Sequence, residues 1–262
     1  MTPQSPMSPG TGAIVPGASF AALLDQHDLA PSWSPPAGVI DAPEATTILA
    51  LRWADGILMA GDRRATAGNV IAHRRVKKVY PADDRSAVAI SGTAGMAIEL
   101  TKLFQTEIEH YEKIEGVRLS LDGKANYLAR MVRGNLALAF QGLIVVPLFC
   151  GYDAEAQTGR LYSYDVVGGR YDEQDYATTG SGGNEARAFL KGAWNEGMSG
   201  PEAIRVAMEA LLAAAEEDSA TGGPDPTRGM YPNVVTVTGD GYREIPDDEL
   251  APIAEAALEG RP

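Results

Sequence analysis

The stretch from Thr46 to Thr66 reads TTILALRWADGILMAGDRRAT and holds two β-rich runs separated by a turn signal. TTILALRW and GILMAGDR are apolar and β-forming, and the ADG between them predicts a hairpin. This pattern begins abruptly after residues 1–45, which are rich in Pro, Gly, Ser and Ala. Proline removes backbone donors and glycine raises the entropy cost of ordering, so we expect a flexible leader over 1–45 and one folded domain over 46–262.

Strands and helices alternate in blocks further along the chain. VKKVY and SAVAISG predict two more strands, and apolar residues spaced by three and four predict a helix over about 97–115 that ends at Gly116. A second helix is expected over about 121–141. LIVVPLFCGY and GRLYSYDVVGG predict further strands, which two helices follow, from near Gly183 and from Pro201 to about Glu217.

NVVTVTG predicts a last strand, and a C-terminal tail is expected over about 245–262. The expected order of elements is a block of strands, two helices, further strands, two helices and a last strand. This order differs from the regular alternation of a parallel α/β fold. The order favours an α+β layered sandwich, with antiparallel sheets and helices packed outside them.

Composition excludes several classes of function. The 262 residues are 45% hydrophobic and carry a formal charge of -13, which argues against nucleic acid and anionic membranes as partners. The only cysteine is Cys150, in an apolar run, so no disulfide framework is possible and a cytoplasmic location is expected. No apolar run approaches the roughly 18 residues of a membrane span. The N-terminus also lacks the features of a secretory signal.

Catalytic chemistry must work here without a histidine triad. Only His27, His73 and His110 are present, at places that do not suit a Ser-His-Asp arrangement, and no zinc or nucleotide motif occurs, so neither metal nor cofactor is expected. A threonine at a free N-terminus needs neither, because its own amine has a pKa near 8 and stands beside its hydroxyl. Cleavage between Ala45 and Thr46 would create such a residue. The alternative is that Thr46 and Thr47 are ordinary β-formers after a disordered leader.

The motifs TTI…AGDRRAT, KKVY, ISGTAG, GSGG and DSATGG occur in this order. With them the chain, over about Thr46 to Gly239, resembles a proteasome β-subunit, a member of the N-terminal-nucleophile hydrolases. MVRGNL and DSATGGPD resemble the actinobacterial type in particular. The resemblance implies a four-layer αββα sandwich and a threonine endopeptidase whose leader is removed by autolysis.

The resemblance also implies roles for single residues. Thr46 is the nucleophile, Asp62 and Lys78 form its acidic and basic partners, and the backbone amide of Gly92 forms the oxyanion hole. A polar cluster supports the amine and consists of Ser181, Asp218 and Thr221. Thr66 and Ala94 pair with the substrate backbone, and the residues that line the specificity pocket are Ala65, Val76, Ile90 and Ala94. These are small or apolar, so cleavage after apolar residues is expected. The family often has glycine before the cleaved bond, where this chain has Ala45, and slower self-cleavage is expected.

The implied partners are other β-subunits and α-subunits, stacked as seven-membered rings, together with an ATP-dependent unfoldase and unfolded protein substrates. Apolar residues on more than one face of the two central helices fit burial against a neighbouring subunit. Three alternatives remain: a non-catalytic α-type subunit, an inactive structural subunit of the same fold, and the simpler two-ring bacterial peptidase of the same superfamily.

Overall fold

A computed structural model describes residues 46–68 and 70–259 of the chain. All of them belong to one compact unit, Val39–Pro262. The expected leader, with Ala45, lies outside the described residues. No helix among the described residues has both the length and the apolar character that a membrane crossing requires.

The first sheet has five antiparallel strands in the order β10-β1-β2-β11-β12. The expected hairpin is confirmed, because β1 pairs with β2 and Trp53 faces Gly56 at its end. The sheet is buried on both faces: Ile48 and Ala50 of β1 face the other sheet, whereas Leu49 and Leu51 face a helical layer. Its strands are β1 (Thr47–Trp53), β2 (Gly56–Gly61), β10 (Tyr176–Gly180), β11 (Asn233–Thr238) and β12 (Gly241–Glu244).

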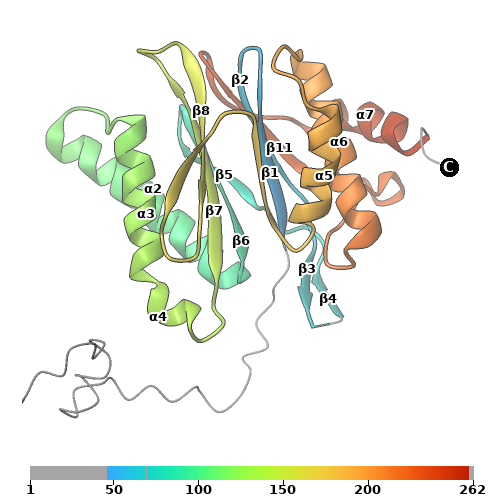
Figure 1. Ribbon diagram of the computed structural model, residues 1–262, viewed down its shortest axis with the longest axis horizontal. Helices are drawn as coiled ribbons and strands as arrows, with labels where there is room; N and C mark the ends of the chain where they lie inside the picture. Colours follow the sequence, from blue (N-terminus) through green and yellow to red (C-terminus); the bar gives the residue numbers. More distant parts are fainter. Residues whose placement is uncertain (1–45, 69, 260–262) are drawn as a thin grey trace, which may run out of the picture. The chain divides into compact units, whose positions relative to one another are not determined.

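The second sheet also has five antiparallel strands, in sequential order from β5 to β9. Its strands are β5 (Val79–Asp83), β6 (Ser86–Gly92), β7 (Val145–Asp153), β8 (Thr158–Tyr164) and β9 (Arg170–Glu173). A separate two-stranded ribbon, β3 (Ala65–Ala67) and β4 (Val70–His73), extends beyond the first sheet near the start of β1 (Figure 1).

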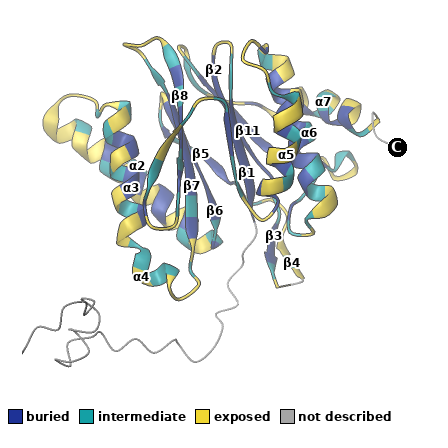
Figure 2. Cartoon of the chain, in the orientation of Figure 1, coloured by how far each residue is buried: buried dark blue, intermediate teal, exposed yellow. Residues whose placement is uncertain are grey.

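Helices cover the outer face of each sheet (Figure 1). The first sheet shares a hydrophobic core with three helices, which are α5 (Gly183–Ala193), α6 (Gly200–Glu217) and α7 (Asp247–Glu259). α2 (Ala94–Glu115) and α3 (Leu121–Gly134) cover the second. Figure 2 shows the buried residues concentrated in the strands and on the inward faces of these helices. The four layers confirm the expected αββα sandwich.

Several elements differ from expectation. The helix expected over 121–141 ends at Gly134, and only the short α4 (Leu136–Ala139), with no buried residue, continues it. The expected tail contains α7, whose Leu250, Ala254 and Ala257 pack in the core against α6. The sequence also did not predict the β3–β4 ribbon, β9, β10, β12 or the 3-10 turn η1 (Pro226–Arg228).

Candidate active site

A fully buried carboxylate lies at the end of β2, beside the start of β1. Asp62 has no exposed surface, and its Oδ1 accepts hydrogen bonds from Lys78 Nζ at 2.5 Å and from the Thr47 N–H at 2.9 Å. Its Oδ2 accepts from the N–H groups of Arg64 at 2.7 Å and Gly222 at 2.9 Å. Four donors occupy the four acceptor positions of the carboxylate, so its negative charge is held in the interior without an unmet polar group.

Lys78 is the cation of this pair and is itself only 4% exposed. Besides Asp62, its ammonium donates to the Arg64 carbonyl at 2.6 Å. Burial lowers the pKa of Lys78 below its ordinary value of 10.5, while the charge of Asp62 opposes that shift. A solvated lysine on an edge strand would have neither contact, so the sequence expectation that pairs Lys78 with Asp62 fits this geometry.

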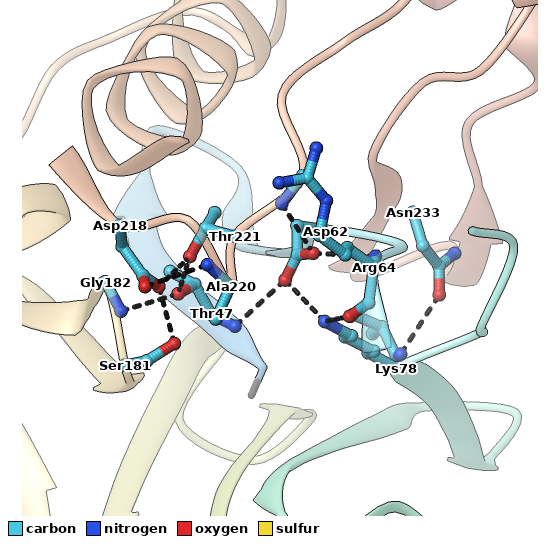
Figure 3. A network of polar contacts seen from close by, with 12 residues as sticks. Thr47, Asp62, Arg64, Lys78, Ser181, Gly182, Asp218, Ala220, Thr221 and Asn233 are labelled. Atoms are coloured by element: carbon cyan, nitrogen blue, oxygen red, sulfur yellow. Dashed lines mark hydrogen bonds and ion pairs between the residues drawn. The ribbon is translucent and has the colours of Figure 1, made fainter. Parts of the chain in front are cut away.

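The peptide bond between Thr46 and Thr47 connects the pair to the candidate nucleophile. Its N–H donates to the same Asp62 oxygen that accepts from Lys78 (Figure 3). Lys78 Nζ and the Thr47 N–H therefore bind one carboxylate oxygen, next to Thr46, which is 6% exposed.

A second polar network begins at the hydroxyl of Thr47 (Figure 3). Thr47 Oγ1 accepts from the Gly182 N–H at 2.9 Å and lies 2.6 Å from Thr221 Oγ1. The Thr221 hydroxyl donates to Asp218 Oδ2 at 2.6 Å, which uses its single hydrogen. Thr47 is therefore the donor to Thr221, and the network runs in one direction from Gly182 to Asp218.

Asp218 closes this network and also binds Ser181. The Ser181 hydroxyl donates to Asp218 Oδ2 at 2.5 Å, and the Ala220 N–H donates to Oδ1 at 3.0 Å. Burial acts to raise the pKa of Asp218, but the hydrogen bonds from Ser181, Thr221 and the Ala220 N–H, with the Arg64 charge, together outweigh it and the pKa is lowered. The structure thus brings the three predicted cluster residues together on the other side of Thr47 from Asp62.

Two glycines permit close backbone contacts at this end of the sandwich. Gly180 pairs with Thr47 at φ +102°, and a Cβ there would lie 1.5 Å from the Thr46 carbonyl oxygen. Gly92 ends β6 at φ +108°, where a Cβ would lie 2.1 Å from the Ile144 carbonyl oxygen. Only glycine fits either position without a backbone shift. The Ser91 and Thr179 hydroxyls, 3.1 Å apart, join the two sheets beside these glycines.

The residues expected to bind substrate occupy several elements. Ala65 and Thr66 are buried in β3, and Val76 is half-buried, its N–H bonded to the Arg63 carbonyl at 3.0 Å. Ala94 is half-buried at the first residue of α2. Ile90 is 3% exposed and packs in the core beneath α2 and α3.

Sequence reasoning assigned no role to Thr47, Gly182, Gly222 or the backbone of Arg64, all of which hold the two networks in place. The signals available were the doubled threonine TT, which was interpreted for its first residue alone, and the motifs GSGG and DSATGG, which contain Gly182 and Gly222. Within the described part of the chain, no group of three or more His, Cys, Asp or Glu side chains is placed to hold a metal ion.

A sandwich of two antiparallel sheets between two helical layers is the fold of the N-terminal-nucleophile hydrolases. A family model described as "Proteasome subunit" matches residues 43–225 of the chain. The chain therefore belongs to the proteasome subunit family, and assembly with other proteasome subunits in rings follows from that membership.

Proposed function

We propose that this chain is a catalytic, β-type subunit of the actinobacterial kind and that it acts in the cytoplasm as a threonine endopeptidase. The observation that supports it best is the single oxygen of Asp62 that accepts from both Lys78 and the Thr46–Thr47 peptide bond. Buried ion pairs with perturbed pKa values cluster at functional sites, and the side chains of this pair are 3% and 0% exposed. The pair lies where a threonine nucleophile needs a cation to lower the pKa of its hydroxyl.

Removal of the leader would be the first reaction of the site. The Thr46 hydroxyl attacks the Ala45 carbonyl carbon, its proton passes to a base, and the bond between that carbon and the Thr46 nitrogen breaks. The nitrogen takes up a proton as it becomes an amine. Water then hydrolyses the resulting ester, which releases the leader as a carboxylic acid and restores the hydroxyl.

In the mature chain the free amine of Thr46 would serve as the base for the same hydroxyl. Lys78 keeps positive charge near the oxygen, and the Gly92 amide binds the developing oxyanion. Ser181, Asp218 and Thr221 orient the start of β1 through Thr47. Thr66 and Ala94 offer backbone groups to an extended substrate, with Ala65, Val76 and Ile90 limiting the adjoining pocket to apolar side chains.

The proposed assembly is a barrel of seven-membered rings, with α-subunits outside and an ATP-dependent unfoldase supplying unfolded substrates. Large apolar side chains exposed on α2 and after α4 support a covered face there. They are Ile98, Leu103, Tyr111, Ile114, Phe140 and Ile144, exposed by 38–66%. An inactive subunit of the same fold, an α-type subunit and the two-ring peptidase are the competing assignments.

The intact mass of the chain, co-produced with its partner subunits, tests the proposal. We expect the mature chain to begin at Thr46 and to hydrolyse peptides, and Thr46→Ala to retain residues 1–45 and to be inactive. Thr106→Ala, an exposed threonine on α2, is the matched control and should be processed normally. A particle that cleaves peptides while every chain keeps its leader would show the proposal to be wrong.

A further inference from the structure

Arginines gather beside the catalytic carboxylate in a chain whose overall charge is -13. A cavity of about 80 Å³ is lined by Arg63, Arg64, Arg74 and Arg228, and Asp225 is the one carboxylate that the described residues add to its lining. A more open hollow of about 500 Å³ shares Arg74 and Arg228 and adds Arg75. We call these five arginines, with the cavity and hollow that they line, the arginine pocket.

Three of the five guanidinium groups donate hydrogen bonds to main-chain carbonyls, which carry no full negative charge. Arg63 Nε donates to the Tyr231 carbonyl at 2.7 Å, and Arg64 Nη1 to the Ser219 carbonyl at 2.7 Å. Arg75 Nη2 donates to the Arg228 carbonyl at 3.1 Å. An arginine has five N–H donors, so each retains others in a fixed orientation.

Among the described residues, two carboxylates form ion pairs with these five arginines, and the Arg64 charge also acts on Asp218. Arg228 pairs with Asp225 at 2.6 Å, and Arg63 lies 3.6 Å from Asp247. Arg74 makes no ion pair or side-chain hydrogen bond with any residue in the described ranges 46–68 and 70–259. The arginine pocket therefore has an excess of positive charge, which an anion would compensate.

The arginine pocket shares a wall with the candidate active site. The N–H groups of Arg64 and Gly222, two of its lining residues, are the donors to Asp62 Oδ2. A Cβ on Gly222 would lie 3.0 Å from Arg64 Cβ, so the glycine allows this close packing. Figure 3 shows the Arg64 guanidinium on the opposite side of Asp62 from Lys78.

We propose that the arginine pocket is a binding site for a peptide carboxylate, supplied by an acidic side chain of a substrate or by the new C-terminus of a product. A water molecule takes about 30 Å³ in the liquid, so the smaller cavity has room for a carboxylate group. The peptide source rests on the proposed function, because the arginine pocket adjoins the residues assigned to peptide cleavage.

The arginine pocket would also affect the chemistry next to it. Burial is the main cause of the lowered pKa of Lys78, and the nearby Arg64 charge adds a smaller lowering. A carboxylate bound to Arg64 offsets this contribution. Acidic peptides would thus bind more tightly and change the electrostatics around Asp62 and Lys78.

Two pairs of peptides distinguish the sources of the carboxylate. The first pair is capped at both ends and differs by one Glu or Gln, placed in turn on each side of the cleaved bond. The second pair has no acidic side chain and ends in a free acid or an amide. The assembled particle is compared with Arg74→Gln, Arg228→Gln and the control Arg130→Gln, an exposed arginine on α3.

We expect kcat/KM to be about tenfold higher for the Glu peptide than for the Gln peptide at one or more positions, or the free-acid peptide to inhibit about tenfold more strongly than the amide. The preference should fall towards one in the Arg74 and Arg228 variants and persist in the control. No preference in either pair, or one that both variants retain, overturns the proposal. Loss of assembly in these variants without such a preference would assign the arginines to a subunit contact and also overturn it.

Failure of the proposed function is recognised separately. If the particle cleaves no peptide, calorimetry with the free-acid and amide pair on the intact chain still tests the arginine pocket. Tighter binding of the free-acid peptide than of the amide, lost in Arg74→Gln, would support the carboxylate site even if the chain is not a peptidase. Equal binding of the two peptides would reject the site.

Discussion

Replacement of Lys78 by methionine should destabilise the fold by about 3 kcal/mol. Removal of one partner of a buried ion pair costs about 3–5 kcal/mol, because the other charge is left uncompensated. Asp62 would keep three backbone N–H donors, from Thr47, Arg64 and Gly222, which favours the lower end of that range. Methionine retains most of the lysine stem, so little packing is lost.

The double variant Lys78→Met/Asp62→Asn identifies the cause. If the loss comes from an isolated charge, the double variant should be more stable than the sum of the two single changes implies, by about 2 kcal/mol. Urea unfolding, followed by tryptophan fluorescence, measures all of them in a Thr46→Ala background, where the leader stays attached. Lys77→Met is the matched control, since its pair with Glu244 is 37% and 40% exposed, and a change within about 0.5 kcal/mol is expected.

Activity gives a second measurement on the same variant. With Thr46 present, Lys78→Met should lose leader removal and peptide hydrolysis by several orders of magnitude, about the scale of removing a member of a catalytic triad. Two results would refute the electrostatic role of the pair. One is that the stability losses of the two single variants add up to that of the double variant, and the other is a Lys78→Met chain that matures and cleaves at the normal rate.

Three further predictions concern the surroundings of Thr46. Thr221→Val should slow leader removal about tenfold or more, because the Thr47 hydroxyl loses its acceptor. Thr221→Ser keeps a hydroxyl and should restore the rate of leader removal. A normal rate of mass loss in Thr221→Val would contradict a role for the Thr47–Thr221 hydrogen bond. Gly180→Ala should lower the unfolding free energy by about 3 kcal/mol or more, since its Cβ would overlap the Thr46 carbonyl. Gly192→Ala, whose Cβ would have no atom within 4 Å, should not destabilise the fold. Equal urea midpoints for the two variants would disprove the steric argument. Because the pKa of Lys78 is lowered, the folded chain releases that proton before the unfolded chain does, so the unfolding free energy should rise with pH from the folded-state value up to 10.5. Urea titrations across that pH interval should show this rise in the parent chain and not in Lys78→Met. If the unfolding free energies of both chains changed equally with pH, Lys78 would not be the cause of the rise.

The sequence predicted the long elements and missed the short, polar ones. β1, β2 and α2 have apolar runs or three-and-four spacing that burial enforces, as with Phe104 and Ile108. β4 lacks such a pattern because it packs little, and Val70 is 68% exposed; β3 is buried but has only three residues. The segment of α7 was assigned to a tail although its buried Leu250, Ala254 and Ala257 have helical spacing, and α3 ends at Gly134 although apolar residues continue.

Within the site, residue types were predictable and the connections between them were not. Asp62 and Lys78 are 16 residues apart, and only their resemblance to family motifs paired them. The backbone donors from Arg64 and Gly222 have no side-chain signal at all. Thr47 illustrates this limit, because a β-forming threonine fits the strand pattern whether or not its hydroxyl bonds to Thr221.

The donors to Asp62 come from parts of the chain that are synthesised at very different times. Thr47 and Arg64 leave the ribosome early, whereas Gly222 lies 160 residues beyond Asp62 and is made near the end. A nascent chain that has reached only α5 lacks Asp218 and Thr221 as well, and so cannot hold the start of β1 in place. Loss of the leader would then record that one molecule has finished folding, and a chain stalled or truncated before residue 222 would stay an inert precursor.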